Sequence, residues 1–336
     1  MELQNLIIDD AVSIEQNTQE NTITIKAGDS SKRLSDLIKD FPENCYINKQ
    51  ITGCGGTTLV LRNYVDYVVL VPYVNLLKSK VADNDHLDYI NIIKRGGEWT
   101  DNDAEISEQL ADRSKPRKII CTFDSLPALM KIKGFVPGEF KLLVDEAHTL
   151  VNLGSFKAPK CEFILHNYSK FASYVFLTAT PTKREYFPDL IGHLPLCTIE
   201  WDNVRAVKFN LQRLDKGVSI NNALFNLCLS FLLGREEGNA HIFYNSVKEI
   251  TQVMEWLSKI VGTDGKPVFN RDEIRLICSK SARNEKKLDT KLGAWGLVDD
   301  VVEKPVGKLN FYTSTMFEGA DIYDEHGKTY IIINGL

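Results

Sequence analysis

The sequence lacks any long apolar run and any excess of positive charge. No segment of its 336 residues approaches the roughly 18 uncharged apolar residues that a membrane-spanning helix needs. The acidic start MELQNLIIDD has no basic segment of the kind that opens a secretory signal. We therefore expect a cytoplasmic protein with no membrane partner. The 40 Lys and Arg against 45 Asp and Glu give a net charge of -5, so any nucleic-acid binding must be local.

Paired cysteines and low-complexity tracts are also missing. The seven cysteines are odd in number, form no CxxC pair, and mostly lie in apolar runs such as RLICS and KIICT. This pattern predicts buried, reduced thiols rather than metal ligands or a disulfide framework. The 11 prolines and 21 glycines leave no room for a long low-complexity tract, so we expect an ordinary globular protein.

Short runs rich in Val, Ile and Leu alternate with helical patterns along the whole chain, which is typical of parallel sheets covered on both faces. The predicted strands are 45–48, 67–71, 118–122, 141–145 and 174–178, then 240–244, 274–278, 309–313 and 329–333. The length favours two packed units. We predict an α/β fold with an N-terminal extension at 1–31 that holds one strand at 22–26, a doubly wound lobe at 32–202, and a second lobe at 203–336. The chain stops directly after a strand, so we expect the second lobe to be incomplete.

A glycine-rich segment, QITGCGGTT at residues 50–58, lies between a predicted strand and a predicted helix. Backbone N–H groups in such a turn, together with the positive end of the helix dipole, favour a phosphate group. Against the pattern G-x-x-x-x-G-K-[ST], Gly55 and Thr57 fit, Gln50 replaces the first glycine, and Gly56 stands where the lysine belongs. A tight turn without a ligand is the alternative interpretation.

Two further segments place polar residues at strand ends. In KLLVDEAHTL, a buried strand delivers Asp145 and Glu146, which are suited to hold Mg²⁺ and to polarise a water molecule. The alternative is that these acids and His148 only cap a helix, but the apolar strand before them favours the first interpretation. In FLTATPT, Thr178 and Thr180 offer two hydroxyls, although such threonines also satisfy backbone groups.

The order and spacing of these pieces resemble the superfamily 2 helicase core of DEAD/DEAH type. TGCGGTT resembles motif I, LVPYVNLL motif Ia, CTFDSL the T-x-x-S-L segment, VDEAH motif II, TATPT motif III, HIFYNS motif IV and STMFEGADI motif V. The resemblance covers roughly residues 45 to 336. The GCGGTT loop also resembles that of phage-encoded helicase-like proteins, which would place the chain in the cytoplasm of a host cell.

The resemblance implies two RecA-like lobes that bind ATP and Mg²⁺. The residues implied to bind the nucleotide are Gly53, Cys54, Gly55, Gly56, Thr57 and Thr58, with Gly319 and Asp321 approaching from the second lobe. Thr57 and Asp145 would hold Mg²⁺, and Glu146 would orient the attacking water. His148, Thr178 and Thr180 would couple the nucleotide site to the second lobe. The residues implied to contact a DNA or RNA strand are Pro72, Ser125, Asn245 and Thr315.

Two departures from the family pattern bear on activity. Gly56 removes a cation worth roughly 4 kcal/mol at about 4 Å from a phosphate oxygen, at an effective dielectric constant near 20. We hypothesise that Lys49, just upstream, folds back and supplies this charge; the alternative is an exposed lysine at a strand end. The second departure is the missing Q-x-x-G-R-x-x-R block, whose arginine is worth about 10³ to 10⁵ in rate in related chemistry. The chain is then a piece of a longer protein, receives an arginine from a protein partner that also covers the second lobe, or has lost catalysis.

Two functions therefore remain open. The first is an ATP-dependent nucleic-acid translocase or helicase with impaired hydrolysis. The second is a catalytically degenerate scaffold that binds nucleic acid, nucleotide or a protein partner. A terminase-like packaging motor is disfavoured, because TATPT and FEGADI belong to helicase lobes. For the basic segment RSKPRK at 113–118, a solvated turn is preferred to a phosphate-contacting loop.

Overall fold

The computed structural model divides the chain into two compact units, Met1–Val207 (unit 1) and Lys208–Leu336 (unit 2). It describes residues 3–82, 84, 90–92, 94–95, 98–99, 103–152, 158–204, 210–263, 265–268, 270–279, 281–293, 307–316, 322 and 324–333. We predicted the boundary between residues 202 and 203. Within the described residues, no helix has the length and apolar character needed to cross a membrane.

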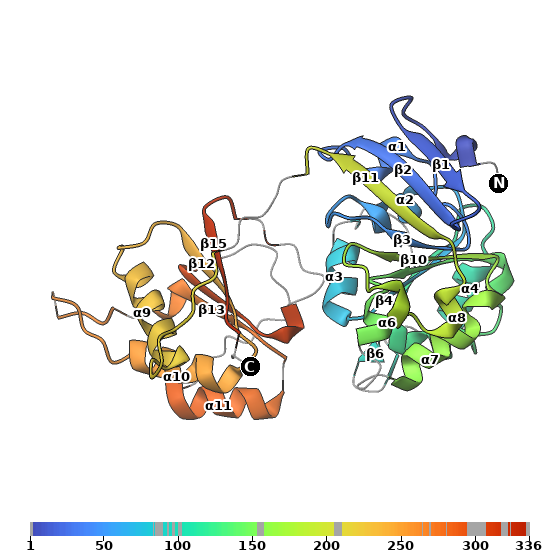
Figure 1. Cartoon of the computed structure of the whole chain (residues 1–336). Helices are drawn as coiled ribbons and strands as arrows, with labels where there is room; N and C mark the ends of the chain where they lie inside the picture. Colours follow the sequence, from blue (N-terminus) through green and yellow to red (C-terminus); the bar gives the residue numbers. More distant parts are fainter. Residues whose placement is uncertain are drawn as a thin grey trace. The chain divides into compact units, whose positions relative to one another are not determined.

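Unit 1 is built on a nine-stranded sheet with the order β1-β2-β11-β3-β10-β9-β4-β8-β5 (Figure 1). Its strands are β1 (Ser13–Asn17), β2 (Thr22–Asp29), β3 (Cys45–Asn48), β4 (Tyr67–Val71), β5 (Ile90–Ile92), β8 (Lys118–Thr122), β9 (Lys141–Asp145), β10 (Ser173–Thr178) and β11 (Leu196–Asp202). Neighbouring strands are parallel except β1 and β2, which are antiparallel. A separate antiparallel pair joins β6 (Lys94–Arg95) and β7 (Glu98–Trp99).

Helices cover both faces of this sheet, which explains why its central strands are apolar throughout. Side chains of α1 (Leu34–Leu37), α2 (Gly56–Arg62) and α3 (Val74–Ala82) pack in one core cluster. Side chains of α4 (Asp103–Ala111), α5 (Leu126–Leu129), α7 (Ala158–Asn167) and α8 (Asp189–Gly192) pack in another. The short helix α6 (Thr149–Asn152) follows β9. All seven cysteines of the chain are free and buried, so the prediction of reduced, buried thiols is confirmed.

The first 31 residues contribute two strands to this sheet, where one strand was predicted. They join it through β11, which pairs with β2 on one side and with β3 on the other. β11 was not predicted from the sequence because its buried residues alternate with polar ones, as in Thr198, Glu200 and Asp202. Alternation of this kind marks a strand with one exposed face, whereas the predicted strands are continuous apolar runs.

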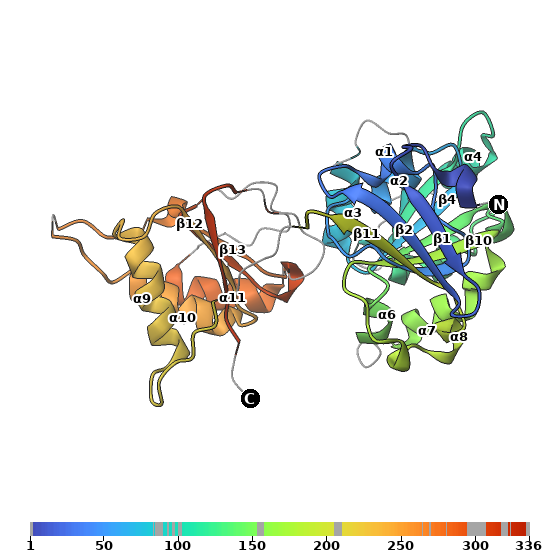
Figure 2. The same cartoon turned by 45° about the horizontal axis from the view of Figure 1, so that its top comes forward.

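Unit 2 contains a four-stranded parallel sheet with the order β13-β14-β12-β15. Its strands are β12 (Asn239–Phe243), β13 (Ile274–Ile277), β14 (Leu309–Tyr312) and β15 (Gly327–Ile331). Its helices are α9 (Ile220–Leu232), α10 (Val247–Leu257) and α11 (Ala282–Leu292), and their apolar side chains share one core with the sheet (Figure 2). The predicted α/β fold with two parallel sheets is confirmed.

Serine residues cap the three α-helices in the described part of unit 2. The hydroxyls of Ser219, Ser246 and Ser281 accept hydrogen bonds from backbone N–H groups three residues later. Each such cap stabilises a helix by about 1 kcal/mol. The caps set where α9, α10 and α11 start, and therefore how their first turns lie near the carboxyl ends of the strands.

Candidate functional site

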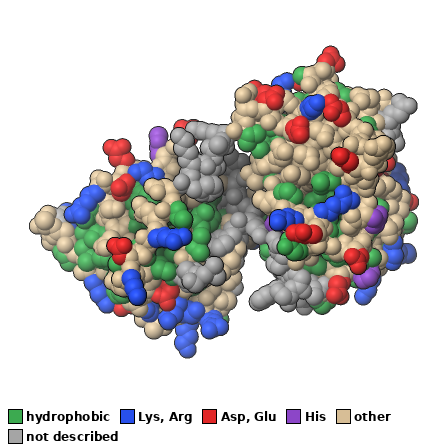
Figure 3. All heavy atoms as spheres, in the orientation of Figure 1, with side chains coloured by type: hydrophobic (Ala, Val, Ile, Leu, Met, Phe, Trp, Pro, Cys, Tyr) green, Lys and Arg blue, Asp and Glu red, His purple; other side chains and the backbone are tan. Residues whose placement is uncertain are grey.

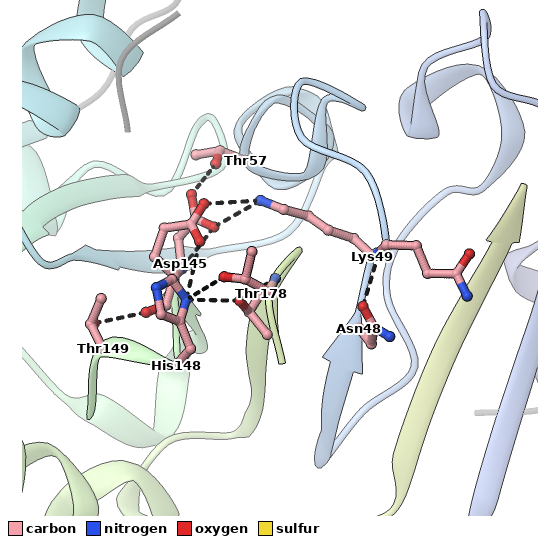
Figure 4. A network of polar contacts seen from close by, with 10 residues as sticks. Asn48, Lys49, Thr57, Asp145, His148, Thr149 and Thr178 are labelled. Atoms are coloured by element: carbon pink, nitrogen blue, oxygen red, sulfur yellow. Dashed lines mark hydrogen bonds and ion pairs between the residues drawn. The ribbon is translucent and has the colours of Figure 1, made fainter. Parts of the chain in front are cut away.

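The polar site of unit 1 forms where three neighbouring parallel strands end. Lys49 follows β3, Thr178 ends β10, and Asp145 ends β9, with β10 lying between the other two strands. Because parallel strands bring their carboxyl ends to one edge of the sheet, residues far apart in the sequence meet there. Figure 4 shows these side chains directed toward one another.

The glycine-rich turn leads directly into α2 beside this edge. Gln50, Gly53 and Gly55 have φ values of 58°, 71° and 84°, in the left-handed region. Gly55 caps α2 in this conformation, which glycine adopts without steric cost. The backbone N–H of Leu34 donates to the carbonyl of Cys54 at 2.8 Å and so fixes the outside of the turn.

The residues of the turn differ in exposure. Gly53 is exposed, Gly55 and Thr58 are half-buried, and Cys54 and Thr57 are buried. The backbone of the turn is therefore open to a ligand at Gly53, whereas the Cys54 thiol faces the core, where burial raises its pKa.

Gly56 occupies a position with no room for a side chain. A Cβ atom there would lie 2.7 Å from Cδ2 of Leu177 and 3.6 Å from Cζ of Phe41. Leu177 belongs to β10 and is fully buried, so it has little freedom to move aside. The packing of the sheet thus leaves no space at this position for the lysine of the phosphate-loop pattern.

Lys49 is buried inside the site, with 7% of its surface exposed. Its Nζ lies 3.4 Å from Oδ1 of Asp145 and 3.4 Å from Oε1 of Glu146. The alternative of an exposed lysine is therefore wrong. Burial alone would lower the pKa of Lys49, but the two carboxylates outweigh burial and raise it, so the ammonium is charged.

The pKa values of Asp145 and Glu146 are shifted in opposite directions, although the two residues are adjacent in sequence. Burial favours a higher pKa for Asp145, but Lys49 and Lys80 outweigh it and hold that pKa below its usual value. The hydroxyl of Thr57 also donates to Oδ2 of Asp145 at 2.8 Å. For Glu146, burial and the charge of Asp145 raise the pKa.

Such a pair supplies one carboxylate that stays ionised and one that is poised to take a proton. Glu146 also has a φ of 51°. A non-glycine residue held in this strained region is a frequent feature of functional sites.

His148 connects the acids to the end of β10. Its Nδ1 lies 2.9 Å from Oγ1 of Thr178, 3.3 Å from Oγ1 of Thr180 and 3.4 Å from Oε2 of Glu146. The structure therefore brings the VDEAH and TATPT segments together. The alternative role of the threonines is also present, because the Thr180 N–H donates to the Thr178 hydroxyl at 3.1 Å.

The residues predicted to contact nucleic acid differ in exposure. Ser125 is fully buried and its hydroxyl lies 2.9 Å from that of Thr122, so it is not open to a strand as we expected. The residue lies inside the start of the helical segment that follows β8, which buries it. Pro72 is buried after β4. Asn245 is exposed, and its Oδ1 accepts a hydrogen bond from the Ser314 N–H at 3.2 Å.

Three other predictions fall outside what the structure describes: Gly319, Asp321 and the side chain of Thr315.

The basic segment at 113–118 forms neither a phosphate-contacting loop nor a fully solvated turn. Arg113 is exposed, but Arg117 is buried and pairs with Asp66 and with Glu139, the latter at 3.0 Å. Lys118 is buried too, and its ammonium donates to the Val60 carbonyl at 2.6 Å. The acids that neutralise this segment lie far from it in the sequence, so sequence inspection alone did not reveal its structural role.

A basic groove in unit 2 was missed by the sequence analysis. It has a volume of about 320 Å³ and is lined by Lys248, Thr251, Arg283, Lys286, Lys287, Thr290 and Lys291 of α10 and α11. Figure 3 shows Lys and Arg side chains along the lower edge of this unit, where Figure 1 places these helices. The signal was available, because basic residues recur three and four positions apart in α11, which puts them on one helix face.

Comparison with solved structures supports the fold. S. cerevisiae Dbp5 bound to RNA and ADP BeF3 matches with a TM-score of 0.50 and 13% identity, over 82% of this chain and 66% of that chain. The Mycobacterium smegmatis helicase Lhr bound to ssDNA and AMP-PNP matches with a TM-score of 0.49 and 16% identity, over 83% of this chain and 38% of that chain. No protein-family model and no curated protein matches the sequence. The likeness to Dbp5 supports a helicase-like fold of two RecA-like lobes. This chain spans only part of both longer proteins.

Proposed function

We propose that this chain is a superfamily 2 helicase-type ATPase that binds Mg²⁺-ATP at the strand ends of unit 1 and acts on a nucleic-acid strand. One observation carries the proposal: the Lys49 ammonium lies between Asp145 and Glu146, 3.4 Å from each, with the Thr57 hydroxyl on the same Asp145 carboxylate. A cation, two acids and a hydroxyl beside a glycine-rich turn are the groups that phosphoryl transfer requires.

Lys49 replaces the lysine that position 56 cannot hold. Without a nucleotide, its ammonium offsets part of the charge of the buried Asp145 and half-buried Glu146 carboxylates, which would otherwise repel each other more strongly. A triphosphate held by the N–H groups of the turn would offer the ammonium a second anionic partner within the same pocket. The positive charge of the site is thereby retained, although it comes from the end of β3 instead of the first turn of α2.

The residues present fit a magnesium ion. Mg²⁺ prefers oxygen ligands, and the Thr57 hydroxyl and the Asp145 carboxylate supply two oxygens that are 2.8 Å apart. Thr57 and Asp145 would hold the ion, which when bound would neutralise charge on the phosphates. Glu146, whose pKa is raised, is suited to accept a proton from an attacking water molecule. His148 would fix the position of Glu146 relative to the end of β10 and to Thr180, which follows it.

Local positive charge in unit 2 supports an interaction with nucleic acid. Among the described residues, Arg283, Lys286 and Lys287 have no hydrogen bond or ion pair from their side chains, so their charges are free to meet phosphates. The exposed Asn245 is a further candidate contact. The Dbp5 structure of similar fold is bound to RNA and the Lhr structure to ssDNA. The chemistry of phosphate contact is the same for both strands.

The second candidate is a degenerate scaffold that binds nucleic acid, nucleotide or a protein partner. The close packing of Leu177 at Gly56 favours this candidate, because it leaves no space for a lysine in the phosphate turn. An arginine that stabilises the transition state would matter little to a scaffold, whereas it would accelerate the ATPase.

The deciding experiment measures the ATPase rate with and without single-stranded DNA or RNA. We expect stimulated turnover that is lost in Glu146→Gln and in Lys49→Ala, and that is retained in the control Lys26→Ala, which breaks an exposed ion pair with Glu15. Equal background rates in the parent and in Glu146→Gln would support the scaffold. If Lys49→Ala bound and hydrolysed ATP as well as the parent, the role assigned to Lys49 would be wrong.

A further inference from the structure

Trp201, near the end of β11, holds the backbone of Lys49. Its indole Nε1 donates a hydrogen bond to the Lys49 carbonyl at 3.0 Å, and 8% of its surface is exposed. The β11–β3 ladder ends at the pair Thr198–Asn48, so this carbonyl lies beyond the ladder. An indole N–H can only donate, and a buried Trp therefore needs an acceptor. The Lys49 carbonyl is that acceptor.

An irregularity in the neighbouring strand directs Trp201 to this position. Glu200 faces Lys26 on β2, but Trp201 faces Gly28, which leaves Ala27 as an extra residue. Gly28 has a φ of 73°, a conformation that glycine adopts without strain. Bulges of this kind re-aim a side chain. The bulge therefore belongs to the local structure that keeps the indole against the end of β3.

We propose that Trp201 is a positioning residue for Lys49. Two other hydrogen bonds hold the Lys49 backbone: its N–H donates to the Thr178 carbonyl at 2.8 Å, and its carbonyl accepts from the Ile51 N–H at 2.7 Å. Trp201 adds the third, from a different strand, and so fixes the point from which the lysine side chain reaches the two acids. The inference rests on the proposed function in treating Lys49 as the phosphate-binding cation.

Trp201 lies close to the point where the chain leaves the sheet of unit 1. β11 is the last strand of unit 1, and the chain leaves the sheet after Asp202. The Ser30 N–H donates to the Asp202 carbonyl at 3.3 Å, which ties the exit of the chain to the end of β2. The segment that leads toward unit 2 is thus anchored one residue from the side chain that holds Lys49.

A double-mutant cycle on the full chain tests the proposal. Trp201→Phe keeps an aromatic ring and removes the N–H, so we expect the affinity for Mg²⁺-AMP-PNP to fall about two- to tenfold, the effect of one hydrogen bond. In the Lys49→Ala background, Trp201→Phe should change the affinity no further. The control is Tyr168→Phe, which removes a part-buried hydrogen bond to the Leu190 carbonyl elsewhere in unit 1 and should leave affinity unchanged. Equal losses from Trp201→Phe in both backgrounds would mean a merely structural role and would overturn the proposal.

Hydrogen exchange without nucleotide separates this inference from the proposed function. In Trp201→Phe, the amides of Lys49 and Ile51 should exchange about two- to tenfold faster, with no such change in Tyr168→Phe. Unchanged exchange at both amides refutes the positioning role, even if the parent chain binds no nucleotide. If the parent chain binds no nucleotide but these two amides exchange faster in Trp201→Phe, the proposed function is wrong. The role of Trp201 in positioning the Lys49 backbone is then still supported. Should Trp201→Phe not fold, benzothienylalanine at position 201 keeps the ring size, lacks the N–H, and gives the same two outcomes.

Discussion

Replacing Lys49 with Met should destabilise unit 1 in a manner that depends on pH. The ammonium lies 3.4 Å from one oxygen of each acid, and each contact is worth about 5 kcal/mol at an effective dielectric constant of about 20, before desolvation is subtracted. Because desolvation offsets most of this attraction, the measurable quantity is the cost of leaving the acids unpaired, about 3 to 5 kcal/mol. We expect Lys49→Met to lose that much stability at pH 8.

The loss should shrink at lower pH, because Glu146 can then take a proton. Its pKa is already raised by burial and by Asp145, and removal of Lys49 raises it further. A group whose pKa is higher in the folded than in the unfolded state stabilises the fold at low pH, and that stabilisation is lost as the pH rises through the folded value. Each pH unit between the folded pKa of Glu146 in the variant and its lower folded pKa in the parent should therefore recover up to about 1.4 kcal/mol of the loss.

Urea unfolding at pH 5 and pH 8 measures this difference. Only the transition of unit 1 should move, and that of unit 2 serves as the internal reference. The double variant Lys49→Met with Glu146→Gln should recover most of the loss at pH 8, and the control Lys26→Met, in an exposed pair, should cost less than about 1 kcal/mol. A loss that is equal at both pH values, or that Glu146→Gln does not relieve, would refute the electrostatic reasoning.

Three further results are expected. Gly56→Lys should fail to raise the ATPase rate and should lower the unfolding free energy by about 1 to 3 kcal/mol, because its Cβ would overlap Leu177; increased activity would contradict the steric argument. Thr178→Val should slow nucleic-acid-stimulated ATP turnover more than it weakens nucleotide binding, because it removes the hydroxyl 2.9 Å from His148; equal effects on both would argue against a coupling role. The triple alanine variant of Arg283, Lys286 and Lys287 should lower the slope of log K against log salt for single-stranded nucleic acid by about 2, since each neutralised phosphate contributes about 0.7.

The control for the salt experiment is the triple alanine variant of Lys131, Lys133 and Lys170, which are exposed on unit 1. It removes the same charge from a surface with no proposed contact. An equal loss of slope in both variants would assign the effect to net charge instead of the groove.

The strands that bear the site were predictable because they are continuous apolar runs. The predicted bounds of β3, β4, β8 and β9 coincide with the observed ones, and these strands place Asp145 and Lys49 at one edge. The folding back of Lys49 was put forward as a hypothesis, but its two carboxylate partners were not predictable, because they lie nearly a hundred residues away. The crowding at Gly56 was not predictable either, because the neighbouring Leu177 lies in β10. The burial of Ser125 was not predictable because it depends on how α5 packs. Local sequence indicates where a strand ends, and tertiary packing decides which side chains fill the space beyond it.

The place of β11 in the sheet determines when the hairpin of β1 and β2 can pair during synthesis of the chain. β11 lies between β2 and β3, and Thr22 pairs with Leu196, so the hairpin of β1 and β2 has no neighbour until most of unit 1 has left the ribosome. Non-local pairings of this kind are formed late and slow folding. We expect nascent chains that end before residue 196 to leave this hairpin unprotected from proteases, with protection gained once β11 emerges.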